Sequence, residues 1–121
     1  MMVRMDQVTE LRRRLLIDLA RNEAELSQLG RDHANLIAAS ESSNADDEHD
    51  PEGATIAFER AQLASIMTRI RQTVADLRQA LSDIDDGGYG ICDDCGEPIS
   101  PARLAIRPQA RLCITCARLK R

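Results

Sequence analysis

The sequence contains very few aromatic residues. Phe58 and Tyr89 are the only two among 121 residues, and tryptophan is absent. A compact globular domain of this length normally buries several large rings. The chain is instead 43% hydrophobic and 30% charged, and leucine, isoleucine, alanine, arginine and acidic residues dominate it. This composition predicts a mainly α-helical protein with long helices.

Long apolar runs are missing as well. The longest strongly apolar runs span three or four residues, whereas a membrane-spanning helix needs about 20. The first ten residues, "MMVRMDQVTE", contain no apolar secretion core. We therefore expect a cytoplasmic protein that has no membrane partner.

The chain also lacks the features of a nucleic-acid binder or an enzyme. Its net charge is −4, which argues against binding along a phosphate backbone, and it offers few rings for base stacking. It has no glycine-rich phosphate loop, no histidine-rich metal site with an open position and no visible pair of nucleophile and base. We expect a protein that is not an enzyme.

Two long segments carry helical apolar periodicity. Residues 6–39 and 55–85 each place an apolar residue every three or four positions, close to a heptad seam. Gly87 and Gly88 are expected to end the second helix. The first stripe consists of Val8, Leu11, Leu15, Leu19, Leu26, Leu29 and Leu36, with Asn22 and His33 on the same face. The second consists of Leu63, Ile66, Ile70, Val74, Leu77, Leu81 and Ile84.

The two helices are expected to pair with each other. Neither can bury its stripe alone, and their similar lengths favour a long antiparallel helical hairpin that packs as a coiled coil. Residues 40–54, "SESSNADDEHDPEGA", would connect them as an acidic tip without lysine or arginine, with Pro51 and Gly53 marking a turn. Residues 1–86 would form this hairpin domain, and residues 87–121 a second domain.

All four cysteines lie in the second domain, in two matched pairs. Cys92, Cys95, Cys113 and Cys116 follow the pattern Cys-x2-Cys-x17-Cys-x2-Cys. Each Cys-x-x-Cys places two sulfurs on one side of a tight turn, and two such turns complete a tetrahedron around Zn²⁺. A redox motif or a pair of disulfides is the weaker alternative, because no α/β unit and no secretion signal is visible. We expect one structural zinc ion and a small zinc-finger module with a short C-terminal helix.

The residues around these cysteines resemble a known family. The segments Gly88-Tyr89-Gly90, Gly96-Glu97 and Arg103-Leu104, together with Pro108, resemble the signature of the DksA/TraR family of bacterial RNA polymerase-binding proteins. In that family a long helical hairpin precedes the finger, so the resemblance extends over nearly the whole chain.

The resemblance implies a function. Family members bind RNA polymerase directly, without sequence-specific DNA contact, and the hairpin enters the secondary channel, where acidic residues at its tip come near the catalytic Mg²⁺. The resemblance thus implies a transcription regulator of initiation, often acting together with ppGpp, whose contact residues are left unassigned. We expect the protein to be a monomer. The alternative is a zinc-ribbon coiled-coil adaptor for another protein or for nucleic acid.

The tip departs from the family's Asp-x-x-Asp-x-Ala motif. Counting back from Cys92 places His49, Glu52 and Ala54 at the three motif positions, and Asp50 is adjacent to the replaced first acid. These four residues are the candidate partner-binding residues at the tip. On the finger, Arg103 and Arg107 are candidates for a docking surface.

Overall fold

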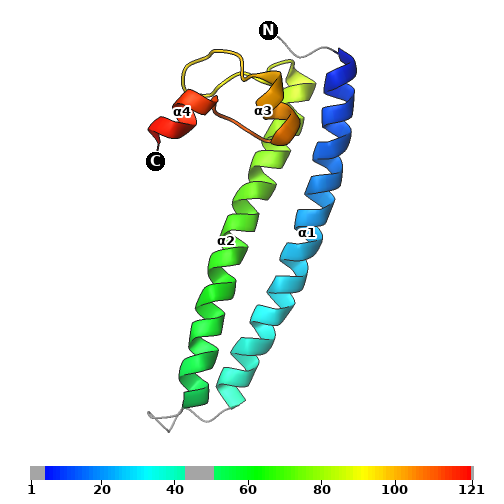
Figure 1. The fold of residues 1–121 in the computed structure, drawn as a ribbon. Coiled ribbons are helices and arrows are strands. Elements are labelled where there is room, and N and C mark those ends of the chain that lie inside the picture. The colour runs from blue at the N-terminus through cyan, green and yellow to red at the C-terminus, as the bar shows by residue number, and fades with distance from the viewer. Residues whose placement is uncertain (1–4, 43–50, 121) are drawn as a thin grey trace. The chain divides into compact units, whose positions relative to one another are not determined.

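The computed structural model describes residues 5–42 and 51–120, and they form four helices (Figure 1). The helices are α1 (Met5–Ser42), α2 (Pro51–Asp86), α3 (Pro101–Ile106) and α4 (Ile114–Leu119). In this part of the chain the only strand-like pairing is an isolated bridge between Ile91 and Pro98. The fold is therefore mainly α, a helical hairpin followed by a small four-cysteine module, as the sequence predicts.

Both long helices extend beyond their predicted limits, so the predicted connection over residues 40–54 is too long. α1 continues to Ser42, and α2 begins at Pro51 instead of residue 55. Pro51 was expected to mark a turn, but it occupies the first helical position. Proline suits that position because its fixed φ is helical and the missing N–H would have no intrahelical partner. Gly53 lies in the first turn of the same helix.

Two glycines end α2, as expected. Gly87 has a φ of +82°, a conformation that glycine adopts without strain. The N–H of Gly87 donates to the carbonyl of Ile84 at 3.3 Å, and the N–H of Gly88 donates to that of Asp83 at 2.8 Å. This pair of hydrogen bonds is the Schellman motif, which satisfies carbonyls that the helix leaves unpaired.

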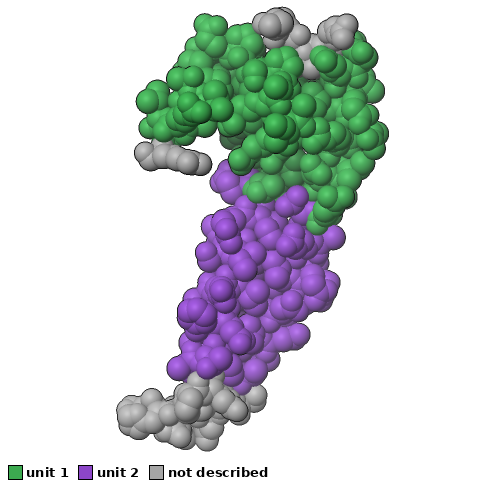
Figure 2. Space-filling view, in the orientation of Figure 1, with its two compact units in different colours: residues 1–21, 73–121 green, residues 22–72 purple. Residues whose placement is uncertain are grey.

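The chain divides into two compact units (Figure 2). The first unit contains residues 1–21 and 73–121, and the second contains residues 22–72. Each unit thus combines a stretch of α1 with a stretch of α2, running antiparallel. The division of the chain into a hairpin domain (1–86) and a finger domain (87–121) stays a prediction.

The first unit contains most of the buried side chains. Leu15 and Leu77 are 0% exposed and pack with Ala80 across the two helices. Partly buried apolar residues surround this cluster: Leu19, Leu81, Ile84 and Tyr89. On the surface nearby, Arg12 and Asp85 form an ion pair at 2.5 Å. The predicted stripes therefore face each other here.

The second unit has a thinner core. Met67 and Ile70, at 8% and 9% exposure, are its buried apolar residues among those described. Apart from Ile70, the predicted stripe residues of this unit are half-buried: Asn22, Leu26, Leu29, His33, Leu36, Leu63 and Ile66. A two-helix seam without a third element leaves its side chains partly open to water.

Across the described residues, no helix is both long enough and apolar enough to cross a membrane.

Candidate metal centre

The first pair of cysteines lies on a tight turn that glycine makes possible. The N–H of Cys92 donates to the carbonyl of Glu97 at 2.9 Å, and the N–H of Gly96 donates back to the carbonyl of Cys92 at 3.0 Å. Gly96 has a φ of +73°. A residue with a side chain would have a higher conformational energy at that φ. These bonds fold Cys95 back beside Cys92.

The second pair of cysteines begins a helix. Cys113 is the N-cap of α4, and its sulfur accepts a hydrogen bond from the N–H of Cys116 at 3.4 Å. The cap and the third helical position lie on the same side of the first turn, so both sulfurs face the same way. This is the short C-terminal helix that the sequence predicts.

Arg111 joins the two turns. The N–H of Asp93 donates to the carbonyl of Arg111 at 2.9 Å, and the guanidinium of Arg111 donates to the carboxylate of Asp93 at 2.7 Å. The same guanidinium lies 3.9 Å from the carboxylate of Asp76 on α2. This contact was not predicted, because the spacing of the cysteines does not show which charged residues meet.

Helix α3 was not predicted from the sequence, and it contributes Leu104 to the apolar contacts of Cys92. Ser100 caps it, its hydroxyl accepting from the N–H of Arg103 at 3.2 Å, and Pro101 follows at the first helical position. Serine followed by proline is a recognised helix start, so this signal was available in the sequence. The helix buries Leu104 completely.

Cys92 belongs to a hydrophobic cluster at the base of the finger. Only 2% exposed, it packs with Leu11 of α1, Ile99 and Leu104. Partly buried residues complete the cluster: Tyr89, Ala110, Leu112, Cys113 and Cys116. The cysteine turns are therefore held against α1 by apolar packing.

The sulfur atoms of the four cysteines lie close together. All lie within 4.8 Å of one another, and those of Cys95 and Cys113 are 3.9 Å apart. Four thiolates at about 2.3 Å from a tetrahedral Zn²⁺ would be separated by about 3.8 Å. The cysteines are free thiols in the structure. The donor set and its spacing therefore fit a four-thiolate zinc site, and the four donors would leave no position for water.

The thiols are not equivalent. Backbone N–H groups, first of Cys95 and then of Cys113, lower the pKa of Cys92 to about 6. A hydrogen bond to Cys113 and burial raise the pKa of Cys116 to about 12. The N–H of Glu97 lowers the pKa of Cys95, but the hydrogen bond to Cys92 and burial raise it by more. The pKa of Cys95 is therefore raised. The cluster does not ionise fully at neutral pH without a cation, so metal binding would release protons.

The remaining predicted site residues are placed as follows. His49 and Asp50 lie outside the residues that the structure describes. Glu52 lies in the first turn of α2, where the structure describes its backbone only. Ala54 is exposed on α2. Arg103 is half-buried and its Nε donates to the carbonyl of Leu112 at 2.9 Å, while Arg107 is exposed. A partner-binding role of these residues stays a prediction.

Comparison with known proteins identifies the finger. Residues 87–120 match the sequence model of the prokaryotic dksA/traR C4-type zinc finger. The RNA polymerase-binding transcription factor DksA of Caulobacter vibrioides is 44% identical over 46 residues, which cover 38% of this chain and 32% of that protein. The uncharacterized protein YlyA of Bacillus subtilis is 38% identical over 55 residues, 46% of this chain and 44% of YlyA. The chain thus matches less than half the length of these curated relatives.

The fold has a solved counterpart. The structure of transcription factor DksA2 from Pseudomonas aeruginosa superimposes with a TM-score of 0.76, covering 96% of this chain and 84% of that one at 24% identity. The chain is therefore a helical-hairpin protein with a C-terminal four-cysteine zinc finger. That finger is of the DksA/TraR type, and the resemblance stated from the sequence is confirmed.

Proposed function

We propose that the chain is a non-catalytic transcription regulator that binds RNA polymerase directly. The observation that carries this proposal is the dksA/traR zinc finger at residues 87–120 on a fold shared with DksA2. Several of the matched relatives are named RNA polymerase-binding transcription factors. The protein would act in the cytoplasm, as a monomer.

The metal in this proposal is one structural Zn²⁺. Cys92, Cys95, Cys113 and Cys116 would hold it as thiolates, and a closed four-thiolate site stabilises a fold instead of activating water. The ion would fix the two cysteine turns to each other and, through Cys92, to the cluster that contains Leu11. Zinc would thus give the base of the hairpin a defined shape.

The acidic segment between the helices would act on the polymerase. Between the end of α1 at Ser42 and the start of α2 at Pro51 the sequence contains Asp46, Asp47, Glu48 and Asp50, and no basic residue except His49. We propose that the hairpin enters the secondary channel and that Asp50 and Glu52, with His49 and Ala54 beside them, approach the catalytic Mg²⁺ or basic groups there. Charges interact more strongly in such a narrow, poorly hydrated space than in water. Regulation together with ppGpp belongs to the same proposal.

The test is binding to purified core RNA polymerase followed by transcription from a set of promoters. An Asp50→Asn/Glu52→Gln variant removes two charges with little change of shape, and Glu25→Gln/Glu59→Gln removes two charges from exposed helical positions as a control. We expect all three proteins to bind the polymerase and only the tip variant to lose its effect on transcription. Absence of binding by the wild type would overturn the proposal, and an equal loss in the control would overturn the role of the tip.

A further inference from the structure

Two ion pairs connect the first cysteine turn to the segment that holds the second pair of cysteines. Asp93 and Asp94 are the two residues between the first two cysteines. The guanidinium of Arg111 donates to the carboxylate of Asp93 at 2.7 Å, and the ammonium of Lys120 lies 3.3 Å from the carboxylate of Asp94. Both residues that separate the first two cysteines are therefore paired with a cation from the other half of the finger. We call Asp93–Arg111 and Asp94–Lys120 the crossing pairs.

The two cations lie on either side of the second pair of cysteines in the sequence. Arg111 comes two positions before Cys113, and Lys120 comes four positions after Cys116, as the C-cap of α4. The crossing pairs thus hold the second cysteine segment to the first turn at both of its ends. The two turns cannot separate without breaking both pairs.

The position of the crossing pairs matters more than their strength. Their four side chains are between 37% and 63% exposed, so each pair is screened by water and is weak by itself. The four sulfurs, however, can meet only after the 17 residues between Cys95 and Cys113 have closed into a loop, and this closure costs conformational entropy. Contacts that form as the two turns meet offset part of that cost.

The crossing pairs also balance charge beside the metal centre. Four thiolates around one Zn²⁺ are net negative, so an unpaired carboxylate next to them would oppose zinc binding. Arg111 and Lys120 each place a positive charge beside such a carboxylate. The carboxylate of Asp76 on α2 lies 3.9 Å from the guanidinium of Arg111, beyond hydrogen-bond distance. Arg111 is therefore bonded more closely to Asp93 than to the helix.

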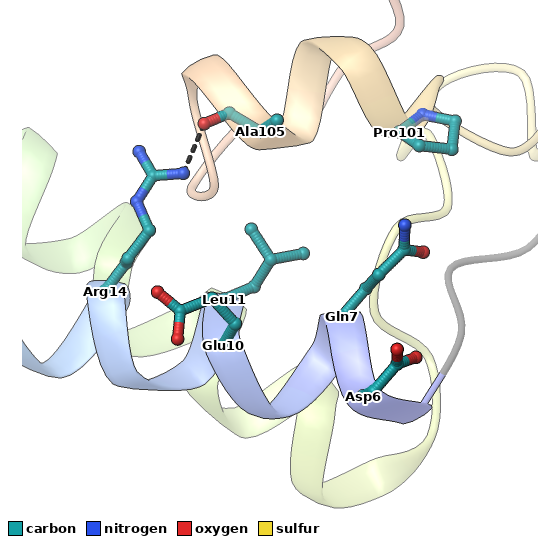
Figure 3. Close-up of a pocket in the computed structure, with 7 residues that line it drawn as sticks. All are labelled: Asp6, Gln7, Glu10, Leu11, Arg14, Pro101 and Ala105. Atoms are coloured by element: carbon teal, nitrogen blue, oxygen red, sulfur yellow. Dashed lines mark hydrogen bonds between the residues drawn. The ribbon is translucent and has the colours of Figure 1, made fainter.

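Another arginine of the first unit contacts the finger without joining the cysteine turns. Arg14 of α1 donates to the carbonyl of Ala105 at the end of α3 (Figure 3). Its removal changes the net charge by as much as the removal of Arg111 does. Arg14 is therefore a matched control for the effect of charge alone.

We propose that Asp93, Asp94, Arg111 and Lys120 are positioning residues of the metal centre. By pairing across the finger they hold the two cysteine turns together, so that the four thiols are gathered before Zn²⁺ binds and the affinity for zinc is higher. None of these side chains is itself a metal ligand. This inference rests on the proposed zinc site and is independent of any contact with RNA polymerase.

The test is a double-mutant cycle for zinc affinity, measured on the full chain by competition with a chromophoric chelator. Asp93→Asn, Arg111→Gln and the double variant form one cycle, and Asp94→Asn, Lys120→Gln and their double variant form the other. We expect a coupling of about two- to fivefold in affinity for each pair, because effects of net charge add up whereas a lost pair is lost only once. The coupling should approach one as the Debye length shrinks from about 30 Å in 0.01 M salt to about 3 Å in 1 M salt. The reversed pair Asp93→Arg/Arg111→Asp should bind zinc more tightly than either reversed single variant.

The control is the cycle of Asp93→Asn with Arg14→Gln, for which we expect a coupling of about one. In Co²⁺-loaded samples every variant should keep the visible absorption bands of the wild type, because the four thiolate ligands are unchanged. Additive effects of Asp93→Asn and Arg111→Gln at low salt would refute the inference. So would an equal coupling in the Arg14 cycle, or shifted Co²⁺ bands, which would show a distorted ligand set. A wild-type chain that binds no zinc would refute the zinc site as well, whereas additive cycles in a zinc-binding protein would refute this inference alone.

Discussion

The hydroxyl of Tyr89 donates a hydrogen bond to the backbone carbonyl of Pro108 at 2.8 Å. The ring of Tyr89 packs against both hydrophobic clusters of the first unit, one around Leu15 and Leu77 and one around Cys92. One of only two aromatic side chains in the chain thus links the end of α2 to the loop that leads into the second cysteine pair.

Replacing Tyr89 by phenylalanine keeps the ring and removes the hydrogen bond. We expect the free energy of unfolding of the zinc-loaded protein to fall by about 1 kcal/mol. Tyr89→Ala removes the ring as well and should cost roughly 3 kcal/mol or more, because it leaves a cavity between two clusters. Urea unfolding measures both, and equal losses in the two variants would show that the hydrogen bond, not the packing, is what matters.

The same residue predicts a loss of stability at high pH. Burial raises the pKa of Tyr89 from 10 to about 12, although the nearby charge of Arg14 lowers it. Between these two values the folded protein holds a proton that the unfolded chain releases, so stability falls as pH rises from 10 towards 12. Tyr89→Phe lacks this titration. The difference in stability between wild type and variant should therefore be constant below pH 10 and shrink above it, and a constant difference up to pH 12 would contradict the assignment.

Gly96→Ala tests the backbone of the first cysteine turn. No atom lies within 4 Å of a Cβ added there, so the cost is the positive φ alone, about 1–2 kcal/mol. Since the turn positions Cys92 and Cys95, zinc affinity in a competition with a chromophoric chelator should fall roughly 5- to 30-fold. Gly88→Ala is the control, because this glycine also has open space around it but no positive φ. Equal effects of the two substitutions would argue against backbone strain as the cause.

Removal of the metal should separate the finger from the long helices. We expect one zinc ion per chain by elemental analysis, and a strong chelator should unfold residues 90–118, because so small a module cannot fold on its own apolar contacts. Far-ultraviolet circular dichroism should lose little signal, since α1 and α2 contain 38 and 36 residues and α3 and α4 only six each. Unchanged dispersion of the finger's amide resonances after chelation would refute a structural zinc site.

The long helices could be predicted because their signal is local. A leucine or isoleucine every three or four positions identifies the buried face, and every predicted stripe residue is buried or half-buried in the structure. Met67 and Ala80 are buried too and were missed, since neither residue type marks a core position by itself. The predicted limits of the connection were wrong because a proline can either begin a helix or interrupt one, depending on its position. Pro51 begins α2.

The convergence of the four cysteines was predictable from the sequence, but the residues that surround them were not. The spacing of the two cysteine pairs alone predicts that the four sulfurs lie together, and they do converge. The contacts that carry the site, such as Arg111 with Asp93 and Cys92 with Leu11, join residues far apart in the chain. The first contact depends on how the finger itself folds and the second on how the finger packs against α1, and no local sequence pattern specifies either.

The thin seam of residues 22–72 has a consequence for how such proteins diverge. A pair of helices with a partly exposed interface requires only that apolar residues recur every three or four positions, and many different sequences meet this requirement. The finger requires particular residues, namely cysteines at four positions and glycine where φ is positive. Accumulated substitutions should therefore remove the sequence similarity of α1 and α2 well before they change how these helices pair. The sequence identity with DksA of Caulobacter vibrioides accordingly extends over 46 residues, whereas the superposition on DksA2 covers 96% of this chain.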